Sequence, residues 1–96
     1  MITEHALLQV KPQQAYAFEA DFRQAAPLLS RSKGYISHQL GKCLEIPGTY
    51  LLLVQWSTLE DHTEGFRKHP DYLLWKSLLH RYYDPLPEVT HYSAIQ

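Results

Sequence analysis

Apolar positions along the chain change their spacing at turn-forming residues, and this spacing predicts the first elements. Ile2 to Lys11 carries a short apolar run with one β-branched residue and stops at Pro12, which predicts a strand. From Ala15 the apolar positions recur at helical spacing and predict an amphipathic helix. We expect Pro27 to end or kink this helix, and Ser30 to Gly34 to form the turn that follows. The apolar stripe of the helix consists of Phe18, Phe22, Ala25 and Leu29.

The middle of the chain predicts a hairpin. Gly34 to Leu44 has the mixed polarity of a half-exposed strand, and Ile46 to Thr49 contains neighbouring Pro and Gly residues, which favour a turn. Tyr50 to Trp56 is almost continuously apolar, a pattern typical of a strand that is covered on both faces.

The last part of the chain predicts two helices and a final strand. Ser57 to Glu60 forms a capping-box pattern, which predicts a short helix as far as about Gly65. His69 to Asp71 places Pro at the first position of a second helix, which Asp84 and Pro85 would stop. Glu88 to Ile95 alternates in polarity and predicts a strand. The apolar stripe of the second helix consists of Tyr72, Trp75, Leu78, Leu79 and Tyr82.

The predicted order of elements is β-α-β-β-α-α-β, within a single domain that covers residues 1–96. Helices folded onto one face of a four-stranded antiparallel sheet give an α+β, ferredoxin-like fold. The strand Tyr50 to Trp56 leaves no polar face, so a second copy of the chain is expected to cover the open side of the sheet. The aromatic fraction of 12% also favours a lined cavity or a buried subunit interface. The sequence therefore predicts a homodimer.

Charge and composition narrow the classes of partner. The formal net charge is −1, and Lys and Arg are scattered among acidic residues, so no basic stripe for nucleic acid is present. The longest apolar run, Tyr50 to Val54, is too short to cross a bilayer, and no signal peptide is visible. A single cysteine, Cys43, fits a reducing compartment. We expect a cytoplasmic protein without a membrane or nucleic-acid partner.

His62 is the best candidate for chemistry. It shares a helical face with Leu59 and Phe66, and this face is expected to turn toward the sheet. A buried neutral imidazole could act as a general base, provided that one ring nitrogen remains free to face a cavity. The alternative is a structural histidine bonded to a backbone carbonyl.

Four aromatic residues could line a substrate site around this histidine or simply pack the core: Trp56, Phe66, Tyr72 and Trp75. The histidines show no spacing that is typical of metal ligands, and no Cys-x-x-Cys motif accompanies them. No glycine-rich phosphate loop is present. We therefore expect neither a metal nor a nucleotide cofactor.

The stretch from Leu51 to Tyr92 resembles the antibiotic biosynthesis monooxygenase (ABM) domain of the dimeric α+β barrel superfamily, and the order of elements extends the resemblance over essentially the whole chain. The resemblance implies two sheets packed face to face in a dimer, with a pocket between the sheet and the helices of each subunit. It is carried by Val54, Gln55, Trp56, Glu60, His62, Gly65, Phe66, Arg67, Pro70, Tyr72, Trp75, Pro87, Val89, His91 and Tyr92.

The resemblance also implies a chemistry. Members that oxygenate polyketide anthrones work without a cofactor and use an Asn, a Trp, a Tyr and an Arg, whose positions here hold Leu52, Trp56, His62 and Lys76. Two functions follow as expectations. One is a cofactor-independent monooxygenase acting on a small aromatic or quinone-like substrate, with His62 as base and the four aromatic residues as walls. The other is a non-catalytic dimeric module that binds a small apolar ligand or only self-associates.

Overall fold

Four strands and two main helices follow the order that the apolar pattern predicts, in a computed structural model that describes residues 1–96. The strands are β1 (Ile2–Gln9), β2 (Tyr35–Lys42), β3 (Thr49–Trp56) and β4 (Val89–Ser93). The main helices are α1 (Ala15–Ser30) and α2 (Pro70–Leu79), and three single-turn elements are η1 (Pro12–Gln14), the π-helix η2 (Asp61–Phe66) and η3 (His80–Tyr82).

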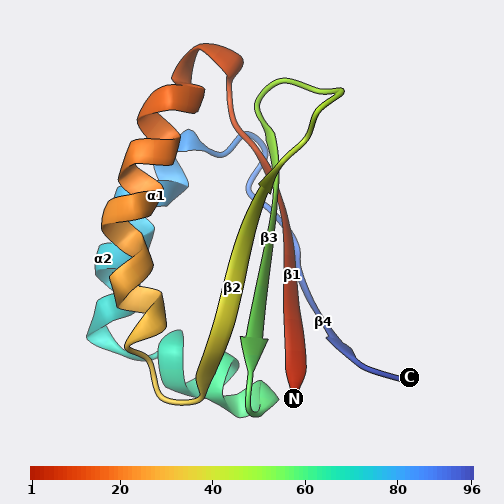
Figure 1. Cartoon of the computed structure of the whole chain (residues 1–96). Helices are drawn as coiled ribbons and strands as arrows, with labels where there is room; N and C mark the ends of the chain where they lie inside the picture. The colour runs from red at the N-terminus through yellow and green to blue at the C-terminus, as the bar shows by residue number, and fades with distance from the viewer.

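The strands form one antiparallel sheet in the order β2-β3-β1-β4. The first strand is central: it pairs with β3 on one side and with β4 on the other. Both main helices cover the same face of this sheet (Figure 1). The predicted α+β, ferredoxin-like fold is therefore confirmed.

The core lies between the sheet and the helices. Alternate residues of β3 are buried on this side, as expected for a strand whose side chains point in turn to opposite faces. The predicted stripe of α1 is buried against them, and so are Trp75 and Leu79 of α2. The buried residues of β3 are Tyr50, Leu52, Val54 and Trp56.

Helix α1 does not end at Pro27; it continues to Ser30. Pro27 is exposed, so the backbone carbonyl that loses its partner there can be hydrated. The carbonyl of Pro27 itself accepts a hydrogen bond from the Arg31 N–H at 3.1 Å, which closes the last turn. The chain then leaves the helix through Gly34, whose φ of +82° is a left-handed conformation that glycine adopts without strain.

The segment after β3 differs from the predicted capped α-helix. The backbone N–H of Ser57 donates to the carbonyl of Gly34 at 2.8 Å, and Thr58 caps the turn instead, with its Oγ1 accepting from the Asp61 N–H at 3.1 Å. The turn itself is a wide π-turn, in which the N–H of Arg67 donates to the carbonyl of His62 at 3.0 Å.

The wide turn changes which side chains share a face. His62 and Phe66 are buried as predicted, whereas Leu59 is 38% exposed and does not join them. The prediction for Leu59 is therefore wrong, because it assumed the rotation per residue of an α-helix. A π-turn rotates each residue by a smaller angle.

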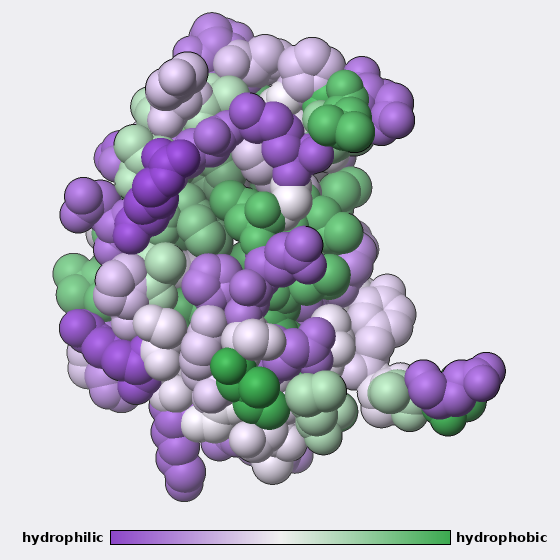
Figure 2. Space-filling model, viewed as in Figure 1, coloured by the Kyte–Doolittle hydropathy of each residue, from purple (hydrophilic) through white to green (hydrophobic).

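The other face of the sheet is not covered within one chain. Leu51, Leu53 and Gln55 of β3 are half-buried, and Leu7 of β1 is exposed. The β2–β3 loop and the C-terminal tail both project on this side, away from the helices (Figure 1), and apolar residues lie along it between the two projections (Figure 2). No helix has the length and apolar character needed to cross a membrane.

Candidate active site

Three titratable side chains from β1, η2 and β4 meet in the buried layer of the sheet. Nδ1 of His62 lies 2.8 Å from Nε2 of His91, and Nε2 of His62 lies 3.3 Å from Oε1 of Glu4. The indole N–H of Trp56 donates to the same Glu4 oxygen at 2.9 Å. We call Glu4, His62 and His91 the buried triad.

Strand register explains how this triad is assembled. Glu4 pairs directly with His91 across β1 and β4, so both side chains lie on the same face of the sheet. Trp56 occupies the last position of β3 on that face, and the π-turn that follows places His62 above it. The triad therefore depends on three elements that are distant in sequence.

Glu4 is not among the residues predicted from the sequence, although a signal for it exists. It lies two residues before Ala6 and four before Leu8, on the buried side of an alternating strand. A carboxylate is unusual on the face of a strand whose other side chains belong to the core, because burying an acid requires hydrogen-bond partners. Glu4 is only 7% exposed.

Burial determines the charge states of the triad. Burial raises the pKa of Glu4, and this effect is partly offset by the hydrogen bond from Trp56 and by the positive charge of Arg67. Burial lowers the pKa of His62 to about 3, with further lowering by Arg67 and by His91. Burial, followed by Arg67, also lowers the pKa of His91. Both imidazoles of the triad are therefore neutral at pH 7.

The predicted aromatic residues gather next to the triad. The Trp56 and His62 rings stack with centroids 5.3 Å apart, and Phe66 lies 6.0 Å from Trp56. Phe66 in turn makes edge contacts with Tyr72 at 5.5 Å and with Trp75 at 5.7 Å. All five predicted site residues thus belong to one cluster, in which only Tyr72 is partly exposed.

His62 does not have the free ring nitrogen that a general base at this position was expected to have. Each of its two nitrogens faces a side chain of the triad rather than a cavity. Its partners also differ from the backbone carbonyl that a structural histidine was expected to have. Any proton that His62 handles must therefore pass to it from His91 or from Glu4.

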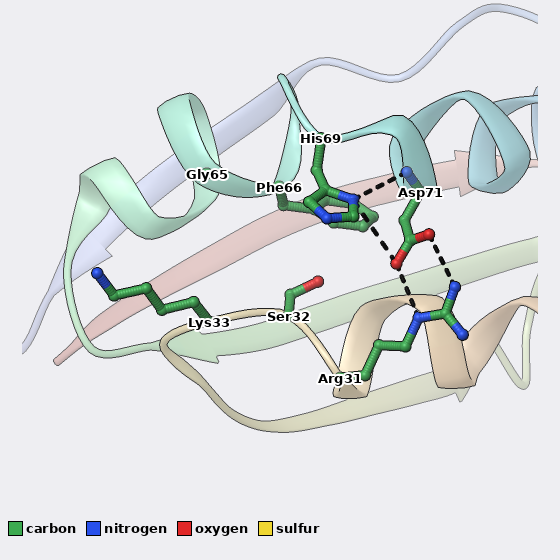
Figure 3. A pocket seen from close by; sticks show the side chains of 7 residues that line it. All are labelled: Arg31, Ser32, Lys33, Gly65, Phe66, His69 and Asp71. Carbon is green, nitrogen blue, oxygen red and sulfur yellow. Dashed lines mark hydrogen bonds and ion pairs between the residues drawn. The ribbon is translucent and has the colours of Figure 1, made fainter.

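A separate cavity of about 420 Å³ opens where α1 ends and α2 begins (Figure 3). The guanidinium of Arg31 donates two hydrogen bonds to the Asp71 carboxylate, both at 2.7 Å, and Nδ1 of His69 accepts from the Asp71 N–H at 3.0 Å. Phe66 is the only one of the predicted site residues that lines this cavity. Its lining consists of Arg31, Ser32, Lys33, Gly65, Phe66, His69 and Asp71.

The character of this cavity differs from that of the aromatic cluster. Most of its lining residues are polar or charged, and the carboxylate of Asp71 neutralises the charge of Arg31. In the sequence, His69 to Asp71 indicates only a helix start, because the segment that contains Arg31 is brought to it by the packing of α1 on α2.

Comparisons with known proteins agree with this fold. The family model described as antibiotic biosynthesis monooxygenase matches residues 1–77. The uncharacterised protein YczJ of Bacillus subtilis (strain 168) is 54% identical over 99% of this chain and 100% of its own length.

Solved structures are similar over nearly the whole chain. One is a crystal structure of a Bordetella bronchiseptica protein that is described as an antibiotic biosynthesis monooxygenase. Its sequence is 33% identical to this chain, and the two structures match with a TM-score of 0.93 over 99% of this chain and 97% of the other. SnoaB of Streptomyces nogalater, described as a cofactor-independent oxygenase, is 20% identical, with a TM-score of 0.83 over 99% of this chain and 93% of its own. At that identity the likeness supports the fold alone.

Proposed function

Because the chain belongs to the antibiotic biosynthesis monooxygenase family, we propose that it is a cofactor-independent monooxygenase of a small aromatic or quinone-like molecule. The observation that carries this proposal is the buried triad beside Trp56. A neutral imidazole that is hydrogen-bonded to a second imidazole and close to a carboxylate is the equipment that proton abstraction requires.

The chemistry begins with loss of a proton from the substrate. The resulting carbanion passes an electron to O2, and the two radicals combine at carbon. When the substrate carbon is an activated methylene group, one oxygen atom of O2 becomes its carbonyl oxygen, and the other leaves as water with the two methylene hydrogens. Oxygen is therefore the only oxidant needed. Trp56, Phe66, Tyr72 and Trp75 would form the apolar walls, and the substrate would enter beside the partly exposed Tyr72.

Oxygen consumption tests the proposal. Purified protein treated with EDTA and given no flavin or metal is mixed with anthrone in an oxygen electrode cell, and anthraquinone is measured as the product. We expect O2 uptake above the buffer rate, and a loss of about 10²-fold or more in His62→Phe. His69→Phe, which alters an exposed histidine at the start of α2, is the matched control. A His62→Phe protein that consumed O2 at the parent rate would show that the triad has no part in the reaction.

The same proposal includes a homodimer formed through the open face of the sheet. Leu7 pairs with Leu51 and His5 with Leu53 across β1 and β3, which gives this face an apolar centre. Thr3 donates to Oε1 of Gln55 at 2.8 Å at one end of the same ladder. A second copy packed on this face would remove the half-exposed leucines from water, as in an isologous interface.

A non-catalytic ligand-binding module is the second candidate. It is favoured by the occupied nitrogens of His62 and by the close packing of the aromatic cluster. The two candidates differ in one measurement. If anthrone quenches the tryptophan fluorescence in a saturable manner, and no O2 is consumed in the presence of the same anthrone, the module is correct and the monooxygenase is wrong.

A further inference from the structure

We infer that His91 takes the proton from the substrate, and that the proton moves through His62 and comes to rest on Glu4. This inference rests on the proposed function for its substrate class, a molecule with an acidic C–H or O–H. The route itself makes predictions that do not depend on oxygen.

His91 is the accessible end of the triad. It lies on the edge strand β4 and is partly exposed, whereas His62 and Glu4 are buried. Its Nε2 contacts His62, and its Nδ1 makes no hydrogen bond within the chain. Of the four imidazole nitrogens in the triad, this Nδ1 alone has no protein partner.

The tautomers follow from Trp56, whose indole nitrogen can only donate. Oε1 of Glu4 therefore accepts from Trp56, and because Nε2 of His62 lies 3.3 Å from the same oxygen, the route assigns the ring proton of His62 to Nε2. His62 then has a lone pair on Nδ1, so His91 must donate to it from Nε2–H. This leaves a lone pair on Nδ1 of His91, which is the atom of the triad that can accept a proton from a bound molecule.

One substrate proton then moves inward in three transfers. The substrate gives its proton to Nδ1 of His91 and becomes an anion. The Nε2 proton of His91 passes to Nδ1 of His62, and the Nε2 proton of His62 passes to Oε1 of Glu4. The result is one carboxylic acid and two neutral imidazoles in new tautomers, with no buried imidazolium left behind.

Burial favours this end state. It disfavours the charged form of His62, whose pKa falls to about 3, and it raises the pKa of Glu4, so the carboxyl group is the member of the pair that can hold a proton. The 3.3 Å separation between Nε2 of His62 and Oε1 of Glu4 must shorten for the last transfer. Catalytic contacts are often long in the absence of substrate.

Arg67 adds a preference for an anionic product. Its positive charge lowers the pKa of all three members of the triad, so it lies within electrostatic range of each. Tyr83 is also within range of the carboxylate, because Glu4 and Tyr72 both raise the pKa of its hydroxyl after burial.

The first test reads the tautomers directly. Nitrogen NMR of protein labelled with [15N]histidine, at pH 7 and without substrate, distinguishes protonated from unprotonated ring nitrogens. The His62 and His91 signals are assigned from His62→Gln and His91→Gln, with His69→Gln, at an exposed position, as the control that leaves both unchanged. We expect both histidines to be protonated on Nε2 and unprotonated on Nδ1. Protonation of His62 on Nδ1 would overturn the route, because His91 would then have no lone pair to offer.

The second test follows proton transfer without oxygen. Exchange of the acidic methylene protons of anthrone is measured in D2O under argon. We expect wild-type protein and His69→Gly, which alters an exposed histidine, to accelerate the exchange, and His91→Gly to lose about 10²-fold of that acceleration or more. Added imidazole should restore His91→Gly, because the missing ring is at the accessible end, and should not restore His62→Gly, where the ring is buried.

The outcomes separate the two proposals. Accelerated exchange with no O2 uptake in air supports the route and overturns the monooxygenase. O2 uptake at the parent rate in His91→Gly supports the monooxygenase and overturns the route. Restoration of His62→Gly but not of His91→Gly by imidazole also overturns the route, because the accessible base would then be at position 62.

Discussion

The contact between Trp56 and Glu4 offers the most direct measurement of how the site is held together. Trp56 is fully buried and its indole N–H is the shortest polar contact that Glu4 makes. Replacing Trp56 by Phe keeps an aromatic ring against His62 but removes the donor. The buried carboxyl group of Glu4 then lacks one of its partners.

The size of the effect follows from these two changes. Truncation of a fully buried Trp to Ala costs about 3–5 kcal/mol in unfolding free energy, and an unsatisfied buried acceptor costs about 1–3 kcal/mol. A small domain has about 5–15 kcal/mol in total, so Trp56→Ala is expected to approach complete unfolding. Trp56→Phe leaves a smaller cavity and is expected to lose about 2–4 kcal/mol, a change that remains measurable.

A double-mutant cycle isolates the hydrogen bond. Unfolding in urea is measured for wild type, Trp56→Phe, Glu4→Leu (which removes the acceptor) and the double variant, all at one protein concentration because a dimer's apparent stability depends on it. We expect a coupling energy of about 1 kcal/mol or more between the two positions. Tyr16→Ala, at a position that is 93% exposed, should stay within about 0.5 kcal/mol of wild type.

Two results would refute this reasoning. A Trp56→Phe protein as stable as the parent would mean that the indole N–H contributes nothing to the buried carboxyl group. A coupling energy near zero, with both single variants destabilised, would mean that the two residues act independently and that Glu4 finds another partner.

Three further predictions concern assembly, pH and the backbone. Leu53→Glu should convert a dimer to a monomer in light scattering at micromolar concentration, whereas Leu73→Glu, on the exposed side of α2, should not; a monomeric parent would contradict the interface. Because the pKa of His62 is lowered to about 3 in the folded state, the unfolded state takes up more protons below about pH 6.5, so this contribution to stability is complete above that pH and is lost as the pH falls toward 3. The unfolding free energy should change with pH by at most about 1.4 kcal/mol per pH unit from this group, and the raised pKa of Glu4 acts in the opposite direction. His62→Phe should therefore flatten the plot of unfolding free energy against pH. An unchanged plot would show that His62 is not the group that titrates. Gly48→Ala should lower the melting temperature by several degrees, because φ is +85° there and a Cβ would overlap a backbone carbonyl oxygen. Gly41→Ala is the control: the nearest carbonyl oxygen would lie 3.9 Å from its Cβ, so the melting temperature should change little. Equal shifts in the two variants would refute the steric argument.

The apolar pattern by itself determined which segments form elements and which face of α1 is buried. The helical stripe of Phe18, Phe22, Ala25 and Leu29 follows from a period of 3.6 residues. Tyr50 to Trp56 was predicted as a strand covered on both faces, and which of its alternate residues are buried within one chain was decided by the fold. His62 and Phe66 were likewise expected on a buried face, and they lie on one. These predictions are local, so neighbouring residues in the sequence are enough to make them.

Local patterns failed where the backbone departs from a regular period. Leu59 and the cap at Ser57 were predicted for an α-helix, and the π-turn together with the hydrogen bond from Ser57 to Gly34 changed both. The competing contact comes from the turn after α1, which the sequence around Ser57 does not contain. A tertiary hydrogen bond of this kind overrides local propensity.

The site was decided by the tertiary structure. His91 was named only among the residues that carry the family resemblance and Glu4 was not singled out, yet the placement of β1 between β3 and β4 puts both on one face within reach of His62. The cavity at Arg31 and Asp71 depends in the same way on the packing of α1 against α2. Strand order and helix packing are set by the burial of the whole core, which stabilises contacts whatever their separation in the sequence. For that reason the partners of a buried polar group cannot be found from the residues beside it in the sequence.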